Sequence, residues 1–590
     1  MNKYIELKKL YSGEYQQLDK NYKWISFIRL LVFVLFFYCG FKALNLLSAG
    51  YTVATFIALI AFVVLMRIHN QLSKKRLIKE KLVEINKEEI TYLNGDDIPF
   101  NDGKEYIDFD HFFTFDLDVF GANSLFQNLN RTATYPGSKR LAQLLKNVLS
   151  NEEIIQNQKA ITELTDKVQW RQNLLALAKI TNDNQKEYNN LLKWTKSSQD
   201  SLSKVMVVLF YLVPLLFVAS FATYFIKDDE LFFHIATGFF IFNLFLAATQ
   251  SKRLKKELID SDHITTIIAQ YGFILEQIEK EEFKSEKLIR LKGKLATQSD
   301  FVSQKIKKLH TLFSNVESVQ NGFAAVLFNG SFLYHIHKLN ALIKWKQQHA
   351  ADIKEWIDVI GEFEALNSMA NFSFNNASFV YPTLNSEWQI NFSELGHPLI
   401  PQGSRVCNDI AFMNNSFIIL TGSNMSGKST FLRTLGINMV LGGIGAPVCA
   451  TEANIHPLDV IVSMRQKDSL NEGESYFFAE VKRLKKIMVR LDEQICFVLM
   501  DEILKGTNSD DKQTGTIEVI KKVISKNAIG CIATHDLEVC KTTDDYPDVL
   551  RNKCFEVEII NNDLSFDYKL RDGVCKNKSA TFIMKKIEII

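Results

Sequence analysis

The sequence predicts a chain in two parts: an all-α region with two pairs of membrane-spanning helices, then an α/β domain from about residue 372. Three observations predict this division. Uncharged apolar runs come in two adjacent pairs, and the segment that follows them has no proline and the mixed charges of long helices. Beyond it, short apolar runs bounded by Gly, Asn, Pro and Asp alternate with helical stretches, which is typical of an α/β domain.

The apolar runs have the length of helices that cross a bilayer. They lack charged side chains at residues 30–41, 43–66, 205–226 and 231–251. About 20 apolar residues suffice for a span, and three of the runs meet that length. The first is shorter, but Arg29 and Lys42 can reach from a longer helix to the lipid–water interface. We therefore expect transmembrane hairpins at 24–67 and 205–251. Residues 322–334 are too few to span, so we expect a buried helix there.

Basic residues flank both hairpins and are sparse in the short loops within them. They are Lys8, Lys9, Lys20, Lys23, Arg67, Lys74, Lys75, Arg76, Lys204, Lys252, Arg253, Lys255 and Lys256. By the positive-inside rule, both termini and the α/β domain face the cytoplasm from the cytoplasmic membrane. The N-terminus is polar and has no signal-peptide pattern. A net charge of +2 gives no general argument for a nucleic-acid partner, and the eight scattered cysteines predict neither zinc nor disulfides.

These boundaries divide the chain into six expected segments. They are a cytoplasmic N-terminal segment (1–23), a first hairpin (24–67), a soluble helical region (68–204), a second hairpin (205–251), a long-helix region (252–371) and the α/β domain (372–590).

A phosphate-binding loop is predicted at the start of the α/β domain. The apolar strand pattern of 417–421 leads into a G-x-x-x-x-G-K-[ST] motif and a helix start, which is the context that this motif requires. Backbone N–H groups of such a loop turn onto phosphate oxygens at the positive end of the helix. Lys428 should reach the β- and γ-phosphates of ATP, and the Ser429 hydroxyl should bind Mg²⁺. The expected binding residues are Gly422, Ser423, Asn424, Met425, Ser426, Gly427, Lys428, Ser429 and Thr430.

Two further strand patterns end in polar residues suited to hydrolysis. The strand 496–500 ends in Asp501 and Glu502, and the strand 528–534 ends in His535. Asp501 can support the metal, and Glu502 can polarise the attacking water as a general base. His535 is placed to sense or stabilise the γ-phosphate.

These motifs together resemble the ATPase domain of the MutS family, the mismatch-repair branch of the ABC-type ATPases. The resemblance is carried by TGSNMSGKST (421–430), DEILKGTN (501–508), ATHDL (533–537), and shorter agreements at 396–400, 408–409, 468–480 and 568–573. Residues 125–145 resemble the start of the MutS core domain and 363–370 its end. The resemblance thus implies an ABC-type P-loop ATPase domain, preceded by an all-α MutS-core-like region that the second hairpin interrupts.

The resemblance also implies a homodimer with composite ATP sites. In the family, the signature serine, here Ser475, reaches the γ-phosphate bound by the partner. His397 lies where the family approaches the nucleotide base. Ser423 replaces the usual proline of the loop, which should not impair phosphate binding. DNA binding is likewise implied by the family, and no small-molecule substrate beyond ATP is evident.

The departures from the family put mismatch recognition in doubt. A membrane hairpin stands where a mismatch-reading domain would precede the core, and no Phe-x-Glu wedge is found there. The lysines of the long-helix region would serve either DNA contact or a solvated helix face. They are Lys284, Lys287, Lys292, Lys294, Lys305, Lys307 and Lys308.

Three functional hypotheses follow. The first is a membrane-anchored, dimeric, ATP-driven switch of the MutS type. The second is an ABC-type transporter or a membrane signalling ATPase without a nucleic-acid role; a transporter is disfavoured because residues 468–480 lack an LSGGQ-like signature and a long soluble stretch separates the hairpins. The third is a non-enzymatic scaffold, disfavoured because every motif residue is present.

Overall fold

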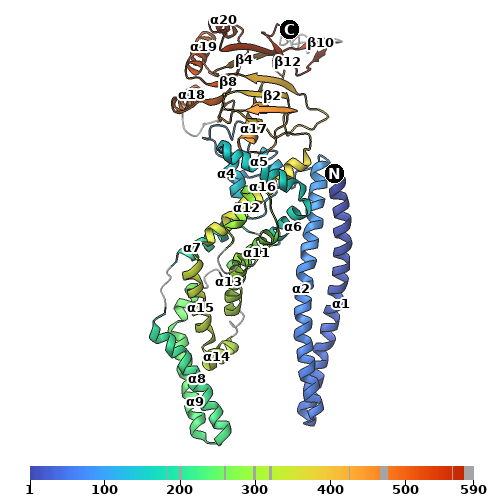
Figure 1. The fold of residues 1–590 in the computed structure, drawn as a ribbon, viewed down its shortest axis with the longest axis vertical. Helices are drawn as coiled ribbons and strands as arrows, with labels where there is room; N and C mark the ends of the chain where they lie inside the picture. Colours follow the sequence, from blue (N-terminus) through green and yellow to red (C-terminus); the bar gives the residue numbers. More distant parts are fainter. Residues whose placement is uncertain are drawn as a thin grey trace.

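The computed structural model describes residues 1–180, 183–197, 202–257, 261–296, 301–317, 322–423, 425–465, 476–560 and 563–576. The α/β region lies at one end of an elongated molecule, and two helical hairpins extend toward the other end (Figure 1). The predicted division into a helical region and a C-terminal α/β region is confirmed.

The first hairpin consists of α1 (Asn2–Leu46) and α2 (Ala49–Leu93), which pack along each other. Each has 45 residues, and a helix of that length measures about 68 Å, more than twice the ~30 Å of a bilayer core. The polar segment 1–23 and the apolar run that follows it belong to one continuous helix, α1. The chain reverses at Leu47, whose φ of 45° is left-handed.

The second hairpin consists of α8 (Lys204–Lys227) and α9 (Glu230–Thr249), and Asp229 caps α9 by accepting a hydrogen bond from the Leu231 amide. By length and composition, α1, α2, α8 and α9 are all able to cross a membrane, and few side chains of their apolar windows are buried. Both hairpins reach in the same direction, away from the α/β region (Figure 1).

The helix expected to be buried at 322–334 is not buried. It is α14 (Gly322–Phe332), which packs against α9 at the base of the second hairpin and exposes most of its large apolar side chains. The prediction was wrong because the sequence shows that a helix is apolar but not which neighbour covers it.

The remaining helices form the body between the hairpins and the α/β region. They are α3 (Leu125–Leu129), α4 (Tyr135–Leu145), α5 (Asn151–Asp166), α6 (Val168–Ala178), α7 (Gln185–Lys196), α10 (Ser251–Glu257), α11 (Ser261–Lys280), α12 (Glu286–Gly293), α13 (Val302–Glu317), α15 (Tyr334–His349) and α16 (Ile353–Asn375). Most of α16 is buried, because α3, α4, α5 and α11 all pack against it. This helix leads directly into the α/β region.

The α/β region contains two main sheets. Its strands are β1 (Thr383–Leu384), β2 (Ile390–Leu395), β3 (Asn408–Phe412), β4 (Phe417–Gly422), β5 (Glu452–Ile455), β6 (Asp459–Ser463), β7 (Cys496–Asp501), β8 (Ile529–Ala533), β9 (Leu550–Phe555), β10 (Glu558–Ile560), β11 (Asp563–Ser565) and β12 (Leu570–Asp572). The six-stranded sheet has the order β12-β9-β4-β8-β7-β6, and its five strands from β9 to β6 are parallel. The four-stranded sheet has the order β1-β5-β2-β3. The helices here are α17 (Lys428–Gly443), α18 (Tyr476–Glu493), α19 (Ser509–Ser525) and α20 (Thr542–Asp545).

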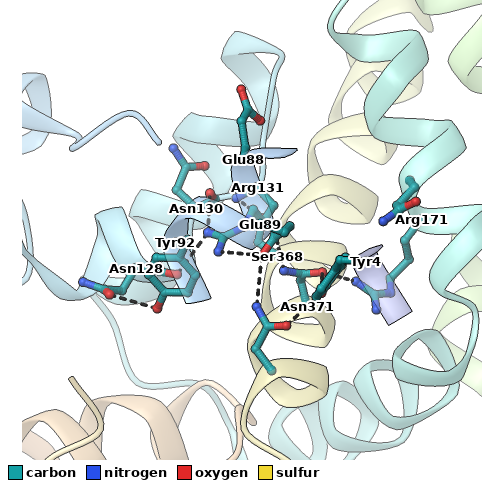
Figure 2. A network of polar contacts seen from close by, with 12 residues as sticks. Tyr4, Glu88, Glu89, Tyr92, Asn128, Asn130, Arg131, Arg171, Ser368 and Asn371 are labelled. Atoms are coloured by element: carbon teal, nitrogen blue, oxygen red, sulfur yellow. Dashed lines mark hydrogen bonds and ion pairs between the residues drawn. The ribbon is translucent and has the colours of Figure 1, made fainter. Parts of the chain in front are cut away.

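A buried polar network joins the first hairpin to α16 (Figure 2). Glu89 of α2 forms an ion pair with Arg131, and Asn371 of α16 donates to the same carboxylate at 2.9 Å. The Oδ1 of Asn371 accepts from the Tyr4 hydroxyl of α1 at 3.2 Å and from Arg171 of α6 at 2.8 Å. Because each group lies in the interior, losing one partner would leave another buried and unpaired. The network therefore fixes both helices of the hairpin to the helix that precedes the α/β region.

Candidate nucleotide site

The predicted loop connects β4 to α17, and its two glycines are closely constrained. Gly427 has a φ of 100° at the N-cap of α17, a conformation that favours glycine. A Cβ on Gly422 would lie 2.6 Å from the Ser426 Oγ and 3.0 Å from the Phe555 carbonyl oxygen. Met425 is exposed at the loop surface. Asn424 lies outside the described residues.

Lys428 lies over this loop. Its Nζ donates to the carbonyl oxygens of Gly422 and Ser423, each at 2.9 Å. Burial lowers the pKa of Lys428, while the carboxylates of Glu502 and Asp501 raise it again. A buried ammonium held at the end of a strand and the start of a helix is well placed to exchange these acceptors for phosphate oxygens.

Ser429 and Asp501 are brought together from different elements. The Ser429 Oγ, in the first turn of α17, donates to the Asp501 Oδ2 at the end of β7 at 2.5 Å. A hydroxyl beside a carboxylate fits Mg²⁺, which is usually held by few protein ligands together with substrate phosphates and water. Within the described ranges, no group of three or more His, Cys, Asp and Glu side chains is placed to hold a metal by itself.

Glu502 and His535 meet at the ends of the neighbouring strands β7 and β8. The Oε1 of Glu502 lies 2.5 Å from the Nε2 of His535. This hydrogen bond, with the charges of His535 and Lys505, lowers the pKa of Glu502 to about 2 against the opposing effect of burial. Glu502 also has a left-handed φ of 47°, a conformation that non-glycine residues adopt at a cost of about 1 kcal/mol or more.

A cavity of about 420 Å³ connects the loop with these residues. The predicted residues among its lining are His397, Met425, Ser426, Gly427, Lys428, Ser429, Thr430, Glu502 and His535. Burial, then Arg433 and Arg405, lowers the pKa of His397 to about 4. His397 is therefore neutral at pH 7, and its Nδ1 accepts from the Leu399 amide at 3.3 Å.

Sequence reasoning gave no role to several other lining residues, among them Ile400 and Tyr568. The Tyr568 ring lies close over the loop, since its Cδ1 would be 3.0 Å from a Cβ on Gly427. Both stand in segments whose sequence resembles the family, and no local pattern assigned them a role. With His397 they add apolar and aromatic surface to the lining of the cavity.

The remaining predicted site residues are Ser475 and the lysines of the long-helix region. Ser475, expected to act across a dimer, lies outside the described residues. Three of the lysines considered for DNA contact are paired within the chain: Lys287 with Glu362 at 2.5 Å, Lys294 with Glu355 at 3.2 Å and Lys307 with Glu276 at 2.5 Å. These pairs favour a structural role for those three side chains.

Comparisons with known proteins agree with the resemblance of the C-terminal region. Residues 418–589 match the family model of MutS domain V. The DNA mismatch repair protein MutS of Clostridium botulinum (strain Loch Maree) is 30% identical over 225 residues, 36% of this chain and 24% of that protein. The protein of the same name from Clostridium perfringens is 29% identical over 237 residues, 38% of this chain and 26% of that protein. The chain spans about a quarter of the length of these relatives.

Proposed function

In its C-terminal region this chain is a member of the MutS family, and from that premise we propose that it is a membrane-anchored, Mg²⁺-dependent ATPase that works as a dimeric switch. The observation that carries the proposal is the convergence of Lys428, Ser429, Asp501, Glu502 and His535 on one site. They come from the ends of three adjacent parallel strands, β4, β7 and β8, and from the helix that follows β4. The carboxyl ends of parallel strands are where α/β sheets bind ligands.

Each of these residues has its own role in hydrolysis. Lys428 and the loop amides hold the β- and γ-phosphates, and Ser429 and Asp501 hold Mg²⁺, which neutralises charge on the phosphates. Glu502 remains ionised at neutral pH, because its pKa is about 2, and it orients the attacking water and takes its proton. His535 keeps the carboxylate in place and lies beside the γ-phosphate.

The apolar and aromatic part of the cavity lining is suited to the nucleotide base. Tyr568 supplies an aromatic face, Ile400 an apolar surface and neutral His397 a hydrogen-bonding nitrogen. Aromatic and apolar walls with one polar group are the usual lining of a small-molecule site. This arrangement favours a nucleoside triphosphate over inorganic polyphosphate.

Dimerisation and anchoring complete the proposal. Ser475 of a partner subunit closes the site around the γ-phosphate, and the four apolar helices hold the chain in the cytoplasmic membrane with the ATPase on the cytoplasmic face. The buried network of Tyr4, Glu89, Arg131 and Asn371 gives a rigid route from α1 and α2 to α16 (Figure 2). ATP-driven closure of the α/β region would reach the membrane through it.

DNA binding is proposed only from the name of the relatives. Ion pairs engage three of the seven candidate lysines, so we place DNA contact second to the ATPase itself. A transporter is the weaker alternative, because the two hairpins lie apart in the molecule, each attached to a different set of helices (Figure 1).

The proposal is tested by ATP hydrolysis of the detergent-solubilised full chain, with Mg²⁺ or with EDTA, and beside the Glu502→Gln variant. We expect Mg²⁺-dependent turnover in the wild type and a loss of about 100-fold or more in the variant, the contribution of a general base, with ATP binding retained. Absence of hydrolysis and of ATP binding in the wild type would refute an ATPase. Homoduplex, mismatched and branched DNA, each at two salt concentrations, test the DNA partner, because phosphate contacts weaken with salt.

A further inference from the structure

The short helix α14 exposes an apolar surface outside the four long apolar helices. Its 11 residues carry no charge. The exposed side chains are Phe323 at 81%, Phe332 at 52%, Val326 at 49%, Leu327 at 49% and Phe328 at 42% of their accessible surface. Contiguous apolar patches of this kind mark a surface that contacts another apolar phase.

The opposite side of α14 is docked on α9 of the second hairpin. A Cβ on Gly330 would lie 2.3 Å from the Phe240 ring, so the absence of a side chain there lets the two helices approach closely. Asn243 of α9 is fully buried and donates from Nδ2 to the Gly330 carbonyl oxygen at 2.8 Å. Small residues and interhelical hydrogen bonds of this type hold helices together in lipid, where apolar burial gives no driving force.

The corner between α14 and α15 contains buried side chains and hydrogen-bonded backbone groups. Leu333 has a φ of 48°, and its amide donates to the Asn329 carbonyl oxygen at 3.0 Å. The Asn329 side chain accepts from the His335 amide at 3.1 Å. Asn329 and Leu333 are buried. A non-helical turn within a membrane is tolerated where its backbone is satisfied and shielded in this way.

We propose that α14 is a re-entrant membrane element whose exposed apolar face lies among the acyl chains of the cytoplasmic leaflet, beside the second hairpin. This inference rests on the proposed anchoring of α8 and α9 in the membrane and adds a fifth apolar helix to the anchor. Eleven residues measure about 16 Å, roughly half of a hydrocarbon core of ~30 Å. α14 therefore enters one leaflet without crossing, and α15 returns from it to the helical body.

Two observations favour lipid over a second copy of the chain as the occupant. α14 packs against α8 and α9, and these two helices also expose apolar side chains, such as Leu215. The sequence becomes aromatic and basic directly after the corner, where the Lys338 Nζ lies 5.1 Å from the centroid of the Tyr334 ring. Aromatic and basic side chains are enriched at the depth of lipid headgroups.

The experiment uses the full chain in phospholipid nanodiscs with the photoreactive p-benzoylphenylalanine placed at Phe323. Phe221 of α8 serves as the positive control for membrane anchoring, and Phe109, exposed in a turn outside the four long apolar helices, serves as the negative control. All three positions are exposed phenylalanines, so the label replaces a side chain of similar shape without disturbing a core. Lipid adducts are measured by mass spectrometry and protein–protein crosslinks by gel.

We expect phospholipid adducts at Phe323 and Phe221, and none at Phe109. Lipid adducts at Phe221 without any at Phe323 would overturn the re-entrant helix and leave the anchor intact. Crosslinked dimers at Phe323 in place of lipid adducts would instead assign this face to a second copy. Absence of lipid adducts at both positions would refute the membrane anchor itself.

Discussion

The Nε2 of His535 lies 2.5 Å from the Oε1 of Glu502 and 3.3 Å from the Nζ of Lys428. One imidazole nitrogen cannot donate to the carboxylate and accept from the ammonium at the same time. Because Lys428 already donates to two loop carbonyl oxygens, the Nε2 proton belongs to the contact with Glu502. His535 thus orients the proposed base and leaves the lysine free for phosphate.

Removing this imidazole should change the pH dependence of hydrolysis. His535 is the main cause that lowers the pKa of Glu502 from 4.5 to about 2. The contact therefore stabilises the ionised carboxylate. This stabilisation is fully present above pH 4.5 and is lost as the pH falls toward 2. In His535→Ala we expect the Glu502 pKa to rise. The acid limb of the kcat profile should then move to higher pH, and kcat at pH 7 should fall about 10-fold or more. A profile with an unmoved acid limb would separate His535 from Glu502.

Lys428→Met should remove the charge that holds the phosphates. A hydrogen bond to a charged group contributes about 1.5–3 kcal/mol, so ATP should bind about 10- to 100-fold more weakly. Titration with a fluorescent ATP analogue measures this. The matched control is Lys541→Met, because Lys541 is exposed and pairs with Glu538. Equal affinities of the two variants would contradict a phosphate-binding role for Lys428.

The sequence predicted those parts of the fold that depend on a pattern of consecutive residues. The strand patterns before Gly422 and Asp501 and the uncharged runs of the hairpins each depend on consecutive residues, and the structure has strands and helices there. The hydrogen bond of Tyr4 with Asn371 joins residues 367 positions apart, and no local sequence pattern predicts it. The same holds for Tyr568, which stands near the C-terminal end of the sequence but lines the cavity beside the loop of Gly427. The exposure of α14 also depended on packing against a distant helix.

The ion pair of Glu89 and Arg131 should contribute strongly to stability, because both side chains are nearly inaccessible. Glu89→Ala leaves Arg131 charged and buried, and we expect a loss of about 3–5 kcal/mol. Thermal unfolding in detergent, followed by tryptophan fluorescence, measures the change.

Two controls separate this effect from a general loss of charge. The exposed pair Lys354–Asp358 should cost less than about 1 kcal/mol when Lys354 is changed to Ala. The double variant Glu89→Ala with Arg131→Ala should lose less than the sum of the single losses, because no lone charge remains. Additive losses would mean that the two side chains do not stabilise each other.

Gly330 and Gly238 offer a matched pair for the packing of α14. A Cβ at Gly330 meets the Phe240 ring, whereas one at Gly238 meets nothing within 4 Å. Leucine is the better helix former, so Gly238→Leu should leave thermal stability unchanged or slightly raised. Gly330→Leu should cost about 1–3 kcal/mol through overpacking, and it should also reduce lipid adducts at Phe323, because α14 can no longer lie against α9. Adding Phe240→Ala to Gly330→Leu removes the obstructing ring and should restore part of both. If the two leucine variants were equally stable, the close approach of α14 to α9 would be refuted.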